Sequence, residues 1–164
     1  MNESDYTIKE FIEDNFKIKN KEGKLINLKF NHAQNELYNK IKNDFGNKPV
    51  RIIVLKARQL GISTFTEGLI TALTINTPNT DAVLIAHNTE SSSKIYEMTQ
   101  LFIDCLPQGL KPKQKYSNKK QIVFDGEPEG LKSSIRVMAN GDATRGSTYR
   151  LAHVSELAFF DNPK

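Results

Sequence analysis

VRIIVLKARQLGIST, residues Val50 to Thr64, carries the strongest structural signal in the chain. It opens on an apolar run, Val50 to Leu55, which predicts a buried parallel strand. A glycine turn follows and leads into a helix predicted to end near Asn76. Strand, tight turn and helix N-terminus together form an anion site, because backbone N–H groups and the helix dipole converge on one point. The segment therefore predicts a loop that binds phosphate groups.

The spacing within this segment departs from the usual phosphate-loop pattern, G-x-x-x-x-G-K-[ST]. Gly61 and Ser63 stand where the second glycine and the Ser/Thr belong. Lys56 replaces the first glycine and Ile62 replaces the usual lysine, so the cation has moved from the end of the loop to its beginning. From there a long side chain could still reach a β- or γ-phosphate. A coincidental Lys, Gly and Ser in a strand-to-helix turn is the competing interpretation.

Composition places the chain among globular proteins. Its 164 residues suit one domain or part of a larger one, with 38% hydrophobic and 26% charged residues. The net charge of +4 permits a polyanionic partner without requiring one. The one cysteine, Cys105, excludes an internal disulfide and a cysteine-based zinc site. The polar start is not a signal peptide, and no apolar run approaches ~20 residues, so we expect no membrane span and a cytoplasmic location.

Alternating strand and helix patterns predict a parallel α/β sheet. We expect residues 1–48 to form a helix, a hairpin and a second helix. These elements precede a core predicted to comprise residues 49–164. In the core, Ala82 to His87 predicts a buried strand, residues 88–107 a helix, and Leu151 to Ser155 a last strand.

Gln34 is a polar residue near the start of an otherwise core-facing helix. One interpretation is an ordinary surface glutamine. The other is recognition of adenine, because a primary amide can donate to N7 and accept from N6 at once. Its place about 20 residues before the glycine loop is compatible with the second interpretation.

Glu156 directly follows the last predicted strand. In ATPases with a phosphate loop, a carboxylate at such a strand end polarises the water that attacks the γ-phosphorus. The preceding position usually holds the aspartate that binds Mg²⁺, and here it is Ser155, which can hold the metal only weakly or through water. An ordinary glutamate at a helix start is the alternative.

Residues 108–120 read as a basic loop that contains proline. A solvated connection is the simpler interpretation. Clustered lysines around the aromatic ring of Tyr116 also suit contact with a nucleic-acid backbone. The lysines concerned are Lys111, Lys113, Lys115, Lys119 and Lys120.

Four separated segments resemble one known family, in its motif order: FNHAQNELY, KARQLGIST, LIAHNTESSSKIY and RGSTYRLAHVSELAFF. The family is the N-terminal ATPase domain of tailed-phage terminase large subunits, and the match runs from about Phe16 to Asn162. It implies a RecA-like P-loop (ASCE) fold, a three-layer sandwich around a mainly parallel sheet. It also implies ATP and Mg²⁺ as cofactors and translocation of double-stranded DNA into a procapsid in the host cytoplasm. Implied partners are the DNA, the portal protein, the small terminase subunit and sister subunits in a ring.

The resemblance also implies roles for individual residues. Gln34 matches an adenine-reading glutamine, Lys56 a shifted Walker A lysine, and Arg58 an arginine that senses the γ-phosphate. Glu156 matches the catalytic glutamate, aided by Lys56 and Arg58, and Ser63 matches the Mg²⁺ ligand, with Ser155 as a weak one. The full nucleotide-binding set is Gln34, Lys56, Arg58, Gln59, Leu60, Gly61, Ile62, Ser63 and Thr64.

The sequence also departs from this family. It stops at Lys164, before the family's coupling motif and nuclease domain, so we expect a fold truncated at its C-terminal side and no nuclease. Three alternatives stay open: a fragment of a helicase-like nucleic-acid motor, a non-catalytic remnant that binds DNA or portal, and an α/β domain with a coincidental glycine loop. Ile62 and Ser155 are the features that favour a non-catalytic remnant.

Overall fold

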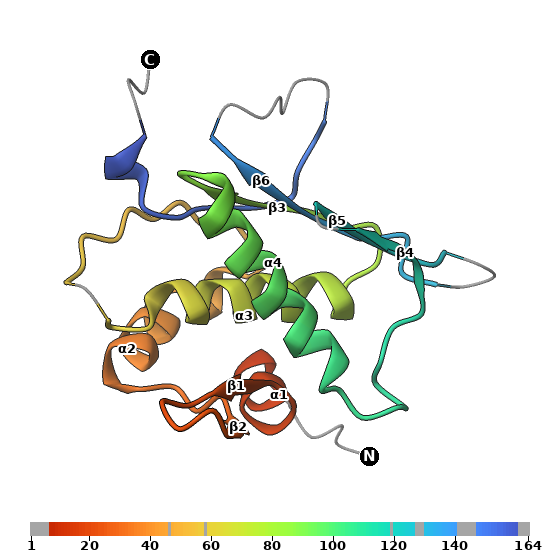
Figure 1. Cartoon of the computed structure of the whole chain (residues 1–164), viewed down its shortest axis with the longest axis horizontal. Helices are drawn as coiled ribbons and strands as arrows, with labels where there is room; N and C mark the ends of the chain where they lie inside the picture. Colours follow the sequence, from red (N-terminus) through yellow and green to blue (C-terminus); the bar gives the residue numbers. More distant parts are fainter. Residues whose placement is uncertain are drawn as a thin grey trace.

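A five-stranded mixed sheet forms one layer of the molecule (Figure 1). The computed structural model describes residues 7–45, 47–57, 59–118, 120–126, 130–140 and 147–160. Within them the strand order is β4-β5-β6-β3-β7. The strands are β3 (Asp81–Ala86), β4 (Gln114–Asn118), β5 (Gln121–Phe124), β6 (Ser134–Ala139) and β7 (Leu151–Val154).

Strand pairing confirms the α/β class but corrects the mainly parallel sheet. β3 runs parallel to β6 and to β7, whereas β4 with β5 and β5 with β6 are antiparallel. A few residues join β4 to β5, and so short a connection permits only an antiparallel hairpin. The predicted strand at residues 82–87 is present as β3, and the last predicted strand is present as β7.

Helices cover one face of the sheet. In Figure 1, α3 (Ile62–Asn76) and α4 (Thr89–Asp104) lie beneath it, and the N-terminal elements lie beneath these two helices. Those elements are α1 (Ile8–Asn15), β1 (Lys17–Lys19), β2 (Leu25–Asn27), α2 (His32–Ile41) and the short helix η1 (Lys42–Asp44). No helix of the described residues covers the opposite face of the sheet (Figure 1). The second helical layer that the predicted three-layer sandwich requires is therefore absent from the described residues.

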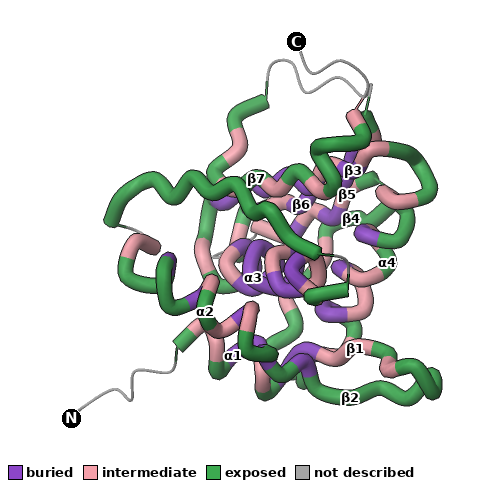
Figure 2. Tube along the Cα trace, turned by 90° about the vertical axis from the view of Figure 1, so that its left-hand side faces the viewer, coloured by how far each residue is buried: buried purple, intermediate pink, exposed green. Residues whose placement is uncertain are grey.

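The apolar run before the glycine loop is not a strand. Val50 to Leu55 pairs with no strand of the described residues, and its side chains are exposed. Ile53 is 95% exposed and Leu55 fully so, whereas Ile52 and Val54 are roughly half-exposed. Figure 2 draws this stretch, between η1 and α3, as an exposed tube. The prediction failed because a buried strand needs neighbours on both sides, and hydrophobicity alone does not supply them.

α3 is the centre of the core. Its apolar and small side chains are buried almost all round, as the purple turns in Figure 2 show. The N-terminal elements pack on α3 and α4 through aromatic rings: Phe30 meets Phe65 of α3 edge-on at 5.0 Å, and Phe16 stacks on Phe102 of α4 at 4.7 Å. Residues 7–45 are therefore integral to the core.

The N-terminal elements match the expected order of helix, hairpin and helix. α1 begins with a capping box, in which Thr7 accepts from the Glu10 N–H while the Glu10 carboxylate accepts from the Thr7 N–H. Gly23 turns the hairpin with φ +78°, a conformation that favours glycine.

The basic segment of residues 108–120 is only partly a loop. β4 occupies Gln114–Asn118 at the edge of the sheet, so Lys115 belongs to an edge strand. Exposed lysine is a common residue on such edges, because it discourages pairing with other chains.

Candidate nucleotide-binding site

The glycine loop turns twice through left-handed backbone conformations before α3 begins. Gln59 has φ +65° and Gly61 has φ +69°. Phe65 N–H donates to the Gly61 carbonyl, while no side chain of the described residues caps the N-terminus of α3. The first N–H groups of a helix have no partner within the helix, so this end can accept an anion.

The capping box of α2 clamps the same loop. Asn31 Oδ1 accepts from the Gln34 N–H at 3.0 Å, and Gln34 Oε1 accepts from the Asn31 N–H at 2.9 Å. The remaining amide groups reach the loop: Gln34 Nε2 donates to the Gly61 carbonyl at 2.8 Å, and Asn31 Nδ2 to the Leu60 carbonyl at 3.1 Å. Loop conformation thus depends on two side chains about 30 positions earlier in the sequence.

Gln34 is buried, so its interpretation as a surface glutamine is wrong. Both ends of its amide are already engaged, one with Asn31 and one with Gly61. Recognition of adenine stays a prediction, and it requires the amide to leave or share these bonds.

The carboxyl ends of three parallel strands meet at one edge of the sheet. After β3 comes His87, after β6 Asn140, and after β7 Ser155 and Glu156. Asn140 N–H donates to the Ala86 carbonyl, and Ser155 N–H to the Ile85 carbonyl. Figure 1 shows the N-terminus of α3 on this same side of the molecule. Ligands of open α/β sheets bind outside this edge.

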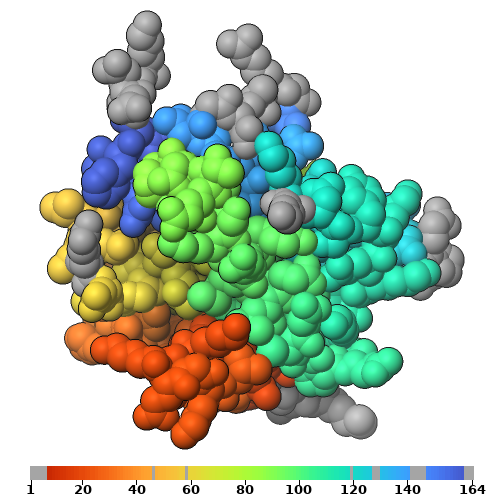
Figure 3. Space-filling view, in the orientation of Figure 1, coloured from red at the N-terminus to blue at the C-terminus, as the bar shows by residue number. Residues whose placement is uncertain are grey.

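Glu156 adopts φ +56°, which is uncommon for a residue with a side chain. The chain turns there into the short helix η2 (Leu157–Phe159), and the Phe159 ring comes to lie 5.5 Å from the His87 ring. Glu156 Oε2 lies 3.0 Å from His87 Nδ1. In Figure 3 the blue residues that follow β7 lie against the green first turn of α4. Strained backbone of this kind concentrates at functional sites.

Lys56 lies near β7. Burial, followed by the positive charge of Lys56, lowers the pKa of His153 from 6.5 to about 4. Lys56 itself is exposed. The charge of the shifted lysine therefore acts on β7, the strand that Glu156 follows, although its ammonium group has no anionic partner that fixes it in place among the described residues.

The other residues of the predicted nucleotide site differ in burial. Ile62 is buried at the first position of α3, which explains why this position is apolar rather than lysine. Leu60 is exposed, and Ser63 and Thr64 are half-buried in the first turn of the helix. Arg58 lies outside the described residues.

The donors available for Mg²⁺ are mainly hydroxyl groups. Within the described ranges, no group of three or more His, Cys, Asp or Glu side chains could hold a metal ion. Ser63 would supply one oxygen and Ser155 a weaker one. Mg²⁺ keeps several waters and is bound largely by substrate phosphates, so this donor set fits an ion that arrives with ATP.

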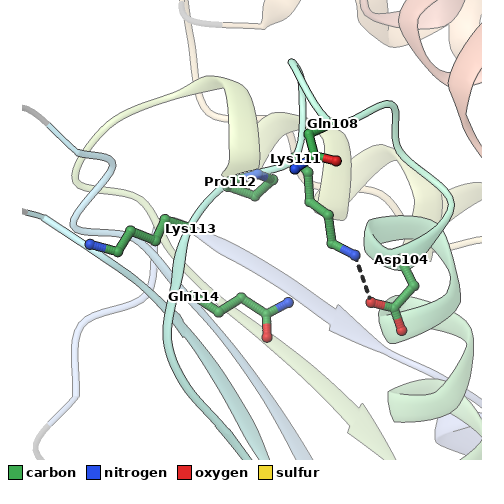
Figure 4. Close-up of a pocket in the computed structure, with 6 residues that line it drawn as sticks. All are labelled: Asp104, Gln108, Lys111, Pro112, Lys113 and Gln114. Atoms are coloured by element: carbon green, nitrogen blue, oxygen red, sulfur yellow. Dashed lines mark hydrogen bonds and ion pairs between the residues drawn. The ribbon is translucent and has the colours of Figure 1, made fainter.

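The described part of the basic segment, which carries Lys111, Lys113, Lys115 and Lys120, lies at the far side of the molecule from the glycine loop (Figure 1). Lys111 pairs with Asp104 at 3.2 Å, and Lys113 with Asp125 at 2.9 Å. Lys111 and Lys113 line an open groove of about 500 Å³, drawn in Figure 4, with Asp104, Gln108, Pro112 and Gln114. Lys115 and Lys120 are exposed, and Lys119 lies outside the described residues.

Sequence reasoning missed His87 and Asn88 as members of this site. Both stand directly after β3, at the same sheet edge as Glu156. A polar pair at the end of a buried strand is the signal that could have revealed them.

Comparison with protein-family models finds no match for this chain, and comparison with curated proteins finds no similar one. Among the described residues, no helix combines the length and the apolar character that crossing a bilayer requires.

Proposed function

We propose that this chain is the nucleotide-binding part of a DNA-packaging ATPase of the terminase large-subunit type, with a RecA-like P-loop fold. One observation carries the proposal. Glu156 follows β7 at a sheet edge on the same side of the molecule as a positive-φ glycine turn and an uncapped helix N-terminus (Figure 1), and the charge of Lys56 acts on His153 of that strand. This is the set of groups that phosphoryl transfer needs: anion-binding N–H groups, a cation and a carboxylate that orients water.

The proposed reaction is hydrolysis of the γ-phosphoryl group. The phosphates of Mg·ATP bind at the Gly61 turn and the first turn of α3. Lys56 and Arg58 neutralise charge as it shifts in the transition state. Glu156 orients a water, whose oxygen bonds to the γ-phosphorus while the bond to the β,γ-bridging oxygen breaks. ADP leaves with the bond electrons, and the proton of the water passes to the carboxylate or to the released phosphate.

Calorimetric titration of Mg·ATP into the 164-residue chain tests the binding step. We expect the Lys56→Ala variant to bind at least ~10-fold more weakly than the wild type, a loss of about 1.4 kcal/mol. Lys24→Ala is the matched control, because Lys24 pairs with Glu22 on the hairpin, away from the loop. Equal affinity in all three proteins would contradict the role of Lys56, and absence of binding in all three would contradict the nucleotide site.

A non-catalytic module that binds DNA or portal is the second candidate. The observation that favours it is Gln34, whose amide is buried and hydrogen-bonded at both ends within the protein. Release of inorganic phosphate from Mg·ATP distinguishes the two. Turnover that disappears in Glu156→Gln supports the ATPase, whereas nucleotide binding without turnover supports the module.

A further inference from the structure

We infer that His87 is a positioning residue for Glu156, and that Asn88 sets the imidazole tautomer that this role requires. The inference rests on the proposed function for its catalytic meaning. The geometry that supports it is independent of any nucleotide.

The first step is the amide orientation of Asn88. Asn88 is the N-cap of α4, and its Oδ1 accepts from the Ser91 N–H at 2.8 Å. This bond fixes the oxygen on the helix side, so Nδ2 is the atom that points away from the helix. N-cap bonds of this type are a recurrent feature of helix starts.

The second step is the tautomer of His87. Asn88 Nδ2 lies 2.8 Å from His87 Nε2. An amide nitrogen can only donate, so Nε2 must accept and carries no hydrogen. In the neutral ring the hydrogen therefore resides on Nδ1. The Asn88 cap of α4 thus determines which ring nitrogen of His87 carries the hydrogen.

The third step is what Nδ1 faces. This atom is buried and has no hydrogen-bond partner among the described residues, yet Glu156 Oε2 lies 3.0 Å away. The contact has the distance of a hydrogen bond but not its alignment. Rotation of the half-exposed Glu156 side chain would align the two groups. The other carboxylate oxygen would then stay available to a water.

The fourth step is how the ring itself is held. Phe159 lies 5.5 Å from it, and the chain reaches Phe159 through the positive φ of Glu156. Backbone strain at Glu156 therefore places both its own carboxylate and an aromatic ring against His87. A carboxylate oriented in this way needs less reorganisation in the transition state than a free one.

Nitrogen-15 NMR of the three histidine rings tests the tautomer directly. Near pH 8.5, about two units above the ordinary imidazole pKa, we expect His87 to carry its hydrogen on Nδ1. Signals that disappear in His87→Ala provide the assignment. Asn88→Asp keeps the helix cap but offers Nε2 an acceptor, so Nε2 should gain a hydrogen in this variant. An Nε2–H ring in the wild type, or no response to Asn88→Asp, would overturn the inference.

Steady-state ATP hydrolysis tests the consequence. We expect His87→Ala to lower kcat at least tenfold with little change in KM. His87→Asn should recover much of the loss, because its amide nitrogen lies as many bonds from the backbone as Nδ1. His32→Ala, at the exposed start of α2, is the matched control and should match the wild type. A kcat for His87→Ala within twofold of the wild type contradicts the positioning role.

The two measurements separate two kinds of failure. If the wild type has no turnover that depends on Glu156, the ATPase proposal is wrong, and the positioning role falls with it. The NMR result then still decides whether Asn88, His87 and Glu156 form the connected set described here. If turnover is present but the His87 variants do not affect it, only the further inference is wrong.

Discussion

Gly61 and Gly23 share a positive φ but differ in their surroundings, which makes them a matched pair for mutation. A Cβ on Gly61 would lie 2.8 Å from Gln34 Nε2, whereas nothing lies within 4 Å of a Cβ on Gly23. Gly23→Ala should lose about 1 kcal/mol of unfolding free energy through backbone strain alone. Gly61→Ala should lose about 2 kcal/mol or more, because the clamp by Gln34 must also shift. Urea denaturation measures the unfolding free energy of both variants. Equal losses would show that the contact between Gln34 and the Gly61 loop contributes nothing to stability.

Glu67 and His153 should give folding stability a distinctive pH dependence. Burial raises the pKa of Glu67 from 4.5 to about 8, so between these values the folded chain holds a proton that the unfolded chain releases. Stability therefore falls as pH rises through that window. The lowered pKa of His153, about 4, acts in the opposite direction between about 4 and 6.5. The two effects oppose each other up to pH 6.5, above which Glu67 acts alone.

Glu67→Gln isolates the Glu67 contribution. Each pKa unit corresponds to about 1.4 kcal/mol, so the wild type should lose up to about 2 kcal/mol of stability between pH 6.5 and 8. The glutamine variant should lose little over the same range, because it has no proton to release. Urea denaturation at the two pH values provides the measurement. Parallel losses in both proteins would show that Glu67 is ionised in the folded state.

At the scale of elements, the N-terminal hairpin should be inseparable from the core. Phe16 is fully buried and stacks on Phe102 of α4. Phe16→Ala should cost about 3–5 kcal/mol of unfolding free energy, through lost burial and the cavity left behind. Ile26, on β2, is 44% exposed, and Ile26→Ala should change stability by no more than about 0.5 kcal/mol. A cost below about 1 kcal/mol for Phe16→Ala would mean that the hairpin folds separately.

Sequence patterns predicted most elements because their causes are local. The 3.6-residue periodicity of α2 and α4, the Gly23 turn and the apolar run of β3 all depend on neighbouring positions. Val50 to Leu55 has the composition of a strand but no strand beside it. Pairing is a long-range property, and composition cannot reveal its absence.

The features of the candidate site also divide into those with local causes and those that depend on long-range packing. Gly61 and Glu156 could be placed from the sequence, because a glycine turn and a strand end are local signals. The hydrogen bond from Gln34 to Gly61 joins residues 27 positions apart. The contact of His87 with Glu156 joins residues that follow two different strands, β3 and β7. Neither could be inferred without the packing of α2 on the loop and of β3 on β7.

At the scale of the whole molecule, the edge bearing β4 is where we expect DNA to bind. Lys115 makes no ion pair with the described residues, unlike Lys111 and Lys113. If Lys115 contacts a phosphate, Lys115→Glu should weaken DNA binding. The slope of log K for DNA binding against log salt should then become less steep by about 0.9. Lys24→Glu, on the hairpin, is the control. A titration of duplex DNA at several salt concentrations that gives equal slopes would remove Lys115 from the interface.

The exposed run of residues 50–57 gives the molecule one site where a protease should cut first. Its backbone belongs to no helix or strand, and the side chains of Ile53 and Leu55 are open to an approaching enzyme. Brief chymotrypsin digestion should cleave after Leu55. The two pieces should still elute together in gel filtration, because Phe16 and Phe30 anchor the smaller piece to the larger one. The chain would then survive as a nicked complex, and nucleotide held beside Lys56 should slow the cut.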